Sequence, residues 1–208
     1  MAAKANKVPR QRILDAAVSL FAQKGYAGVG VREIAKAADV NIAMISYYFE
    51  GKLGILKAII EEFFTRYSNI FRDIDDQSKS PEECGRLMVR RLVNFVKANT
   101  KLALVTYNEL PLESPEIAEM KAEKINELIQ RISGLIRRFG LDPSDTFQIG
   151  VIGPSLIAAV FTNFRFQPVL KHVLRVEFND AYYERLIEII STLFLRGVYG
   201  IAAHKQGP

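Results

Sequence analysis

The sequence predicts an all-α fold, and three observations carry that prediction. Apolar residues recur at the i, i+3, i+4, i+7 spacing of helices along most of the chain. Ser-Pro or Asp-Pro pairs at residues 80–81, 114–115 and 142–143 have the form of helix starts, a capping side chain followed by proline. No strand-like alternation or hairpin turn stands out. The 208 residues, 49% of them hydrophobic, suffice for one or two domains with a sizeable core.

Three helices are expected at the N-terminal end. The first spans about residues 9–24 and the second residues 31–38, whose apolar positions share one face. Asp39 then breaks the pattern, and Asn41, a preferred N-cap residue, starts the third helix. Two short helices joined by such a tight turn form a helix-turn-helix.

The rest of the chain is expected to be helical as well. The expected helices span about residues 53–72, 81–99, 102–109, 115–139, 143–166 and 180–200, with a loop or short helical piece after Pro168. The 143–166 helix is apolar nearly all round, so it must be covered on several sides. We expect it to form a four-helix dimer interface with the last helix and their copies in a second subunit. The alternative is that these two helices pack only within one subunit.

Positive charge is concentrated at the N-terminal end. Residues 1–52 contain eight Lys or Arg and four Asp or Glu, a net charge of +4, whereas the rest of the chain contributes +1. This distribution is what a polyanion-binding domain requires. A flexible basic tail would give the same excess, so charge alone does not distinguish the two.

Two features bear on the compartment. The single cysteine, Cys84, excludes an intramolecular disulfide and favours a reducing compartment, and no N-terminal apolar run resembles a signal peptide. Residues 146–164 carry no charge, but glycines, Pro154 and polar residues interrupt them, and a span usually needs about 20 mainly apolar residues. We therefore expect a cytoplasmic protein with a buried helix here and no membrane span.

The third helix has an outward face unlike an ordinary solvated one. Ile45 and Phe49 face the same way and can close against the second helix, while no charge lies between Val40 and Phe49. Small and apolar side chains can enter a DNA major groove, and tyrosine hydroxyls can donate to phosphates. Lys52 lies near the next helix start, where free N–H groups also favour an anion. The alternative is that this face is buried. The expected DNA contacts are Ile42, Ala43, Met44, Ser46, Tyr47, Tyr48, Lys52 and Arg32.

The N-terminal residues resemble the TetR family of bacterial transcriptional regulators. The matching segments are RILDAA (12–17), LF (20–21), KGY (24–26), VREIAKAA (31–38) and YYF (47–49), with Lys52 and Leu56. The match covers about residues 9–60 and involves three helices and their spacing. The remainder is similar only in its length and its helical character.

The resemblance implies both an organisation and residue roles. Residues 1–52 would form the N-terminal three-helix DNA-binding domain with the helix-turn-helix, and residues 53–208 the C-terminal helical ligand-binding and dimerisation domain. Ile42, Ala43 and Ser46 fall where the family contacts bases. Tyr47, Tyr48 and Lys52 fall where it contacts phosphates. Such proteins are usually homodimeric repressors that release double-stranded DNA when a small molecule fills a cavity in the second domain.

This chain departs from the family at several of these positions. Asp39 stands where the family usually has glycine, and Val29-Gly30 where Thr or Ser is common. The family's base contacts therefore do not transfer directly. An apolar or aromatic effector would suit the aromatic residues of the second domain, which would serve equally well as core. The residues expected at such a cavity are Phe64, Tyr67, Phe95, Tyr107 and Phe161.

Two other classes of function compete with this one. An enzyme is disfavoured because the two histidines, His172 and His204, are far apart in sequence, and neither a metal-ligand spacing nor a glycine-rich phosphate loop occurs. We therefore expect no catalytic residue, metal or cofactor. A helical protein-interaction module without specific DNA binding is the alternative, since the outward apolar face would also suit a protein partner.

Overall fold

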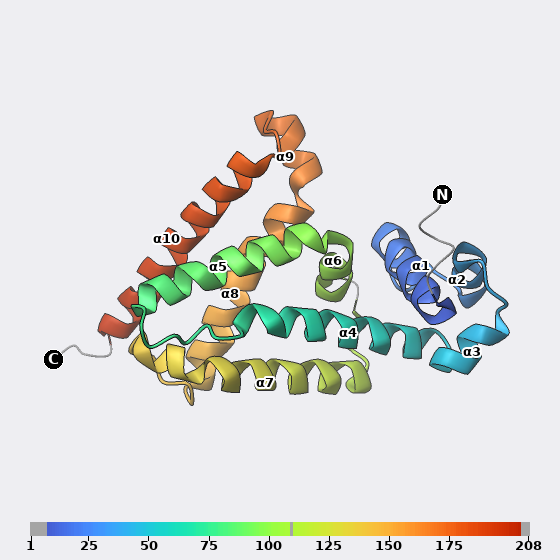
Figure 1. Ribbon diagram of the computed structural model, residues 1–208, viewed down its shortest axis with the longest axis horizontal. Coiled ribbons are helices and arrows are strands. Elements are labelled where there is room, and N and C mark those ends of the chain that lie inside the picture. Colours follow the sequence, from blue (N-terminus) through green and yellow to red (C-terminus); the bar gives the residue numbers. More distant parts are fainter. Residues whose placement is uncertain (1–7, 109, 205–208) are drawn as a thin grey trace. The chain divides into compact units, whose positions relative to one another are not determined.

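The computed structural model describes residues 8–108 and 110–204, which form helices and connecting loops without a strand. Figure 1 shows the order of the helices along the chain. The all-α prediction is confirmed. The predicted basic tail of residues 1–7 lies outside the described residues. By its internal contacts the chain divides into two compact units, one of residues up to 66 with 99–123 and one of residues 67–98 with 124 onward.

The first unit is built on the N-terminal helices. It contains α1 (Pro9–Lys24), α2 (Val31–Ala38), α3 (Ala43–Phe49) and most of α4 (Lys52–Ser68), with α6 (Thr100–Asn108) and the beginning of α7 (Pro115–Arg138). α1 contacts α2, α3 and α6. Large apolar side chains close its core; among them are Phe21, Ile34, Ile45, Leu56 and Ile60.

The second unit contains the end of α4 and the later helices. These are a short 3-10 turn (Asn69–Phe71), α5 (Pro81–Ala98), the rest of α7, α8 (Thr146–Arg165), α9 (Gln167–Leu174) and α10 (Asp180–His204). α5 contacts both α8 and α10, and α8 contacts α10. The α5 helix supplies much of the core through Val89, Leu92 and Val93, which like Val160 and Phe161 of α8 are fully or nearly fully buried.

Most predicted helix bounds agree with the structure within a few residues, and one start is wrong. α8 begins at Thr146 rather than at Pro143. The Asp142 carboxylate accepts hydrogen bonds from the amide and hydroxyl of Ser144, which makes a local turn. Asp145 is the N-cap instead, and its side chain accepts from the amide of Gln148 at 3.0 Å. The two compact units differ from the two predicted domains, which divide after residue 52. Those domains were assigned by their expected functions, and that division stays a prediction.

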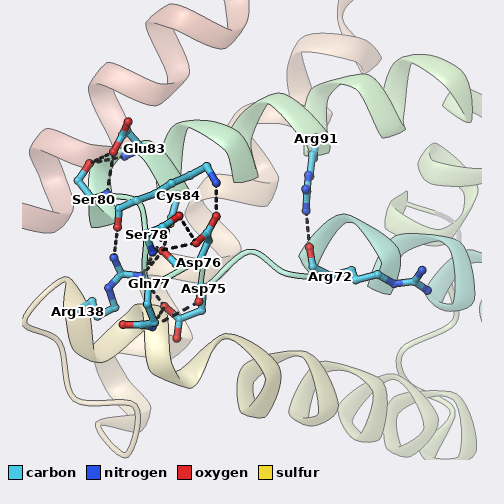
Figure 2. Close-up of polar contacts among 11 residues, drawn as sticks. Arg72, Asp75, Asp76, Gln77, Ser78, Ser80, Glu83, Cys84, Arg91 and Arg138 are labelled. Atoms are coloured by element: carbon cyan, nitrogen blue, oxygen red, sulfur yellow. Dashed lines mark hydrogen bonds and ion pairs between the residues drawn. The ribbon is translucent and has the colours of Figure 1, made fainter.

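The loop between α4 and α5 is fastened by two arginines of the second unit (Figure 2). Arg91 donates to the carbonyl oxygens of Ile70 and Arg72, at 3.1 and 2.6 Å. Arg138 donates to the Asp75 carboxylate at 2.7 Å and to backbone carbonyls of the loop. Cys84 is buried beneath this loop, as a small helix residue.

A reciprocal cap starts α5 where the sequence predicted a helix start. The Glu83 amide donates to the Ser80 hydroxyl at 3.2 Å, and the Ser80 amide donates to the Glu83 carboxylate at 2.8 Å. This capping box satisfies two N–H groups that the helix itself leaves without partners. The bonds from Ser80 lower the pKa of the Glu83 carboxyl group.

The α8 and α10 helices leave apolar side chains exposed. Phe147 and Val151 on α8, and Ile189 and Leu193 on α10, are exposed to 81, 50, 46 and 69%. By length and composition alone, α8 and the 180–203 stretch of α10 could each cross a membrane. In the 18-residue windows that meet this test, 22 and 28% of the residues are buried. Exposed apolar faces are typical of protein or membrane interaction sites.

Candidate nucleic-acid interface

The turn between α2 and α3 is made by one residue in a left-handed conformation. Asp39 has φ 53° and ψ 54°, and its amide donates to the carbonyl oxygens of Ala35 and Lys36, which ends α2. Aspartate tolerates this region better than most residues, so it can stand in place of the usual glycine. Asn41 was expected as the N-cap of α3, but Ile42 occupies that position and makes no side-chain cap. The Asn41 carboxamide oxygen instead accepts from the amide of Ala43 at 2.9 Å, a turn directly before the helix.

The predicted inner and outer faces of α3 are both found. Ile45 and Phe49 are 1 and 5% exposed, so they anchor α3 in the core of the unit. Tyr47 is 82% exposed and Ile42 is 43% exposed. The remaining α3 residues of the predicted interface divide into Ala43 and Ser46, which are exposed, and Met44 and Tyr48, which are half-buried. No described residue of the first unit covers the Tyr47 side chain fully, and its ring meets the Tyr48 ring edge-on at 4.9 Å between centroids.

Lys52 lies at the first position of α4, but its ammonium group is folded back. Nζ lies 4.2 Å from the centroid of the Tyr26 ring and 3.5 Å from the carbonyl oxygen of Ala27. Desolvation in this half-buried position lowers the pKa of Lys52. The contact ties the start of α4 to the end of α1. Sequence reasoning gave Tyr26 no role, although its place directly after Gly25 was visible.

Other basic side chains lie beside α2 and α3. Arg32 is exposed on α2, as its predicted role requires. The Arg10 guanidinium lies 5.3 Å from the centroid of the Phe49 ring, which places a positive charge against α3. Arg12 Nη1 lies 3.7 Å from the Asp39 carboxylate, and Lys24 pairs with Glu33. Arg10 and Arg32, by contrast, have no carboxylate partner among the described residues.

The residues predicted for an effector cavity fall in both compact units. Phe64 and Tyr107 belong to the first unit, and Tyr67, Phe95 and Phe161 to the second. All are buried except Tyr107, which is half-buried. The Tyr67 and Phe95 rings meet edge-on at 5.6 Å, and burial raises the pKa of the Tyr67 hydroxyl. Burial among aromatic rings suits a core equally well, so their role toward a ligand stays a prediction.

Among the described residues, no group of three or more His, Cys, Asp or Glu is arranged to hold a metal ion.

Comparison with known proteins places the N-terminal helices in a described family. Residues 13–59 match the family model of the bacterial regulatory proteins, tetR family. The "Probable HTH-type transcriptional regulator YttP" of Bacillus subtilis is 36% identical over 128 residues, which are 58% of this chain and 62% of that protein. The match thus spans less than two thirds of YttP. The "Fatty acid metabolism regulator protein" of B. subtilis is 29% identical over 191 residues, 90% of this chain and 94% of that protein.

Solved structures resemble the chain over nearly its whole length. The fatty acid degradation regulator FadR of Bacillus halodurans superposes with a TM-score of 0.71 at 25% identity, covering 91% of this chain and 96% of that one. The TetR family transcriptional regulator PfmR of Thermus thermophilus gives a TM-score of 0.67 at 18% identity, covering 89 and 97%. At 18% identity, the likeness to PfmR concerns the fold alone.

Proposed function

We propose that this chain, a member of the tetR family of bacterial regulatory proteins, is a cytoplasmic transcriptional regulator, a repressor that binds a palindromic DNA operator as a homodimer. A small-molecule effector releases it from the operator. Its relatives are named as regulators, one of them as a probable transcriptional regulator.

The exposed face of α3 is the single observation that carries this proposal. Tyr47 and Ile42 stand out from a helix that is otherwise anchored by buried Ile45 and Phe49. Apolar groups without a carboxylate among them suit a major groove, since base edges and thymine methyls are read there at close range. Arg32 and Lys52 supply phosphate contacts at the edges of this face. In this proposal Lys52 leaves the Tyr26 ring to reach a phosphate.

A second copy of the chain is the proposed cover for α8 and α10. Leu193 and Ile189 are exposed on α10, and Val151 is exposed on α8. The same α10 helix exposes Glu184, Arg185, Glu188 and Arg196, charges that a lipid-facing span does not carry. Glycines and alanines on α8 permit close approach of a partner helix. Twofold pairing would set two α3 helices on half-sites about 34–36 Å apart.

The effector is proposed to be a molecule of fatty-acid metabolism with an apolar body. Two of the similar proteins are named as regulators of fatty-acid metabolism or degradation. Within the second unit, Tyr67, Phe95 and Phe161 are aromatic and apolar enough for such a ligand.

A footprint tests the DNA-binding part of this proposal. Purified protein is incubated with the DNA upstream of its own gene, and protection is mapped at several salt concentrations. We expect twofold-symmetric protection, with affinity that falls steeply as salt rises, because phosphate contacts release counterions. Protection without twofold symmetry contradicts the homodimer on a palindrome. Binding that is absent or insensitive to salt favours the helical protein-interaction module instead.

A thermal-shift series tests the effector. Saturated fatty acids of increasing chain length are added to the protein with and without operator DNA. A ligand of the folded state raises the melting temperature. A fatty acid that raises it and also releases the operator supports the proposal, whereas a series without effect on operator binding contradicts the proposed effector class and leaves DNA binding untouched.

A further inference from the structure

The α9 helix carries an apolar surface that its own unit leaves open. It connects the end of α8 to the start of α10 (Figure 1), and all eight of its residues are exposed or half-buried. Val169, Val173 and Leu174 are exposed to 50, 69 and 61%, and Phe166, directly before the helix, is exposed as well. A helix with apolar residues ordinarily buries one face against its own domain. The α9 helix therefore has an apolar face that is free for a partner.

The helix is nevertheless fastened to the second unit. Gln167 Nε2 donates to the Tyr183 hydroxyl of α10 at 3.0 Å. The Tyr183 ring in turn stacks on Phe164 of α8, at 5.5 Å between centroids. These contacts hold the first turn of α9 against both neighbouring helices. Val169 and Val173, four residues apart, therefore form an apolar strip in a fixed place.

The charges beside this strip are mainly positive. Between residues 165 and 179 there are three basic residues and one acid, Glu177, a net charge of +2 with histidine neutral. The three cations, Arg165, Lys171 and Arg175, are exposed. None of them pairs with a carboxylate in the part of the chain that the structure describes, whereas arginines of α5 and α10 do have such partners. The surface therefore combines an apolar strip with unpaired positive charge.

This combination argues against a second copy of the chain as the partner of α9. Two copies of one surface across a twofold axis would bring like charges together, which is unfavourable. The face of α8 and α10 differs, because the exposed charges of α10 have both signs. The partner of α9 should instead be negatively charged and should accept apolar side chains from a projecting helix.

We propose that α9 is a docking surface for an anionic lipid bilayer. Val169, Val173 and Phe166 enter the boundary between headgroups and acyl chains, while Arg165 and Lys171 meet the lipid phosphates. Short amphipathic helices with basic residues bind in the plane of this boundary. The cytoplasmic leaflet carries negative charge, so a cytoplasmic protein has access to it. A bilayer yields to a projecting helix, whereas a protein partner would need a groove of matching shape. This docking requires neither operator nor effector.

Flotation of the full-length protein with lipid vesicles tests this surface. Vesicles of phosphatidylcholine mixed with phosphatidylglycerol are compared with vesicles of phosphatidylcholine alone. We expect binding to the anionic vesicles only, and weaker binding as salt rises. The double variant Arg165→Ala/Lys171→Ala should weaken binding by about 30-fold, since each cation near an anionic surface contributes about fivefold. Val173→Asp should weaken it by about tenfold or more, because it removes an apolar contact and adds a repelled charge.

Matched controls lie on α7 in the same unit. Arg131→Ala/Arg137→Ala removes two exposed cations, and Ile125→Asp changes an exposed apolar residue. Both proteins should bind anionic vesicles like the unchanged protein. The two α9 variants should keep the melting temperature, the operator affinity and the oligomeric state of the unchanged protein, so their effect on vesicles is separate from the proposed function.

Four outcomes would overturn the membrane surface. Absence of binding to anionic vesicles would leave an acidic protein as the partner. Equal binding to neutral vesicles would remove the role of the cations. Binding that both α9 variants leave unchanged would come from another basic surface, such as the DNA-binding helices. A Val173→Asp protein that becomes monomeric would assign α9 to the contact with the second copy.

Discussion

The face of α3 and the face of α8 and α10 both expose apolar side chains, but their surroundings differ. Tyr47 and Ile42 stand on or at the start of a seven-residue helix beside exposed Arg32, with no acidic residue between Val40 and Phe49. Leu193 and Ile189 stand on a 25-residue helix whose exposed charges have both signs. A short apolar face that carries no charge of its own suits a polyanion with apolar base edges, whereas a long one on a helix with charges of both signs suits a copy of itself. Exposure alone therefore does not identify the partner.

The largest effect is expected from a charge placed in the α10 face. Leu193→Asp would bury one carboxylate per subunit in the dimer, and an unpaired buried charge costs about 3 kcal/mol or more. We expect sedimentation to show monomers and operator affinity to fall more than about 100-fold, since 1.4 kcal/mol is about a factor of ten. Val173→Asp on α9 is the matched control, because Val173 and Leu193 are both 69% exposed. A Leu193→Asp protein that remains dimeric would place the interface elsewhere.

The next effect concerns phosphate contacts beside α3. Lys52→Ala should weaken binding to operator and random DNA alike, by about tenfold or more, and reduce the slope of log affinity against log salt by about 1.8, because the dimer loses two phosphate contacts. Fluorescence anisotropy over a salt series measures both quantities. Lys171→Ala, an exposed lysine of α9, should change neither. An unchanged salt slope for Lys52→Ala would mean that the lysine stays on Tyr26 and only supports the fold.

A smaller effect is expected for base recognition. Ile42→Ala removes apolar contact with base edges, so it should cost about 1 kcal/mol on the operator and little on random DNA. Competition with a library of operator variants would show relaxed preference at one position of each half-site. Equal losses on operator and random DNA would remove Ile42 from base recognition and leave it a general contact.

Loss of the α5 cap is expected to have the smallest effect on DNA binding by α3 and on dimerisation through α8 and α10. Ser80→Ala breaks the capping box with Glu83 and should lower the free energy of unfolding by about 1 kcal/mol. Urea denaturation measures this loss, while operator affinity and dimerisation stay unchanged. A Ser80→Ala protein with lost DNA binding would show that stability alone limits binding, which would weaken the interpretation of the other variants.

The N-terminal helices were predictable because their signals are local. The single-faced spacing of α2, the turn at Asn41 and the buried pair Ile45 and Phe49 depend on residues within one or two helical turns. The Ser80–Glu83 box was predictable for the same reason. At α8 two aspartates three residues apart could each start the helix, and only the turn that Asp142 makes with Ser144 assigns the cap to Asp145.

The contacts that join distant segments were not predictable. Lys52 meets Tyr26 across 26 residues, and Arg138 fastens a loop that lies some 60 residues earlier. Sequence spacing carries no information about such pairs, because the fold and not the chain brings them together. The same applies to the ion pair of Arg90 and Glu184, which lie 94 residues apart in the sequence.

The sequence by itself determined that this protein is all-α, where its helices run, and that its third helix turns an uncharged face outward. Helical periodicity and capping are properties of neighbouring residues, so they can be recognised in the sequence alone. Only the tertiary structure decided which apolar residues stay uncovered, where the Lys52 ammonium group lies, and which distant charges pair. Those features depend on which surfaces meet, and burial is set by packing across the whole unit.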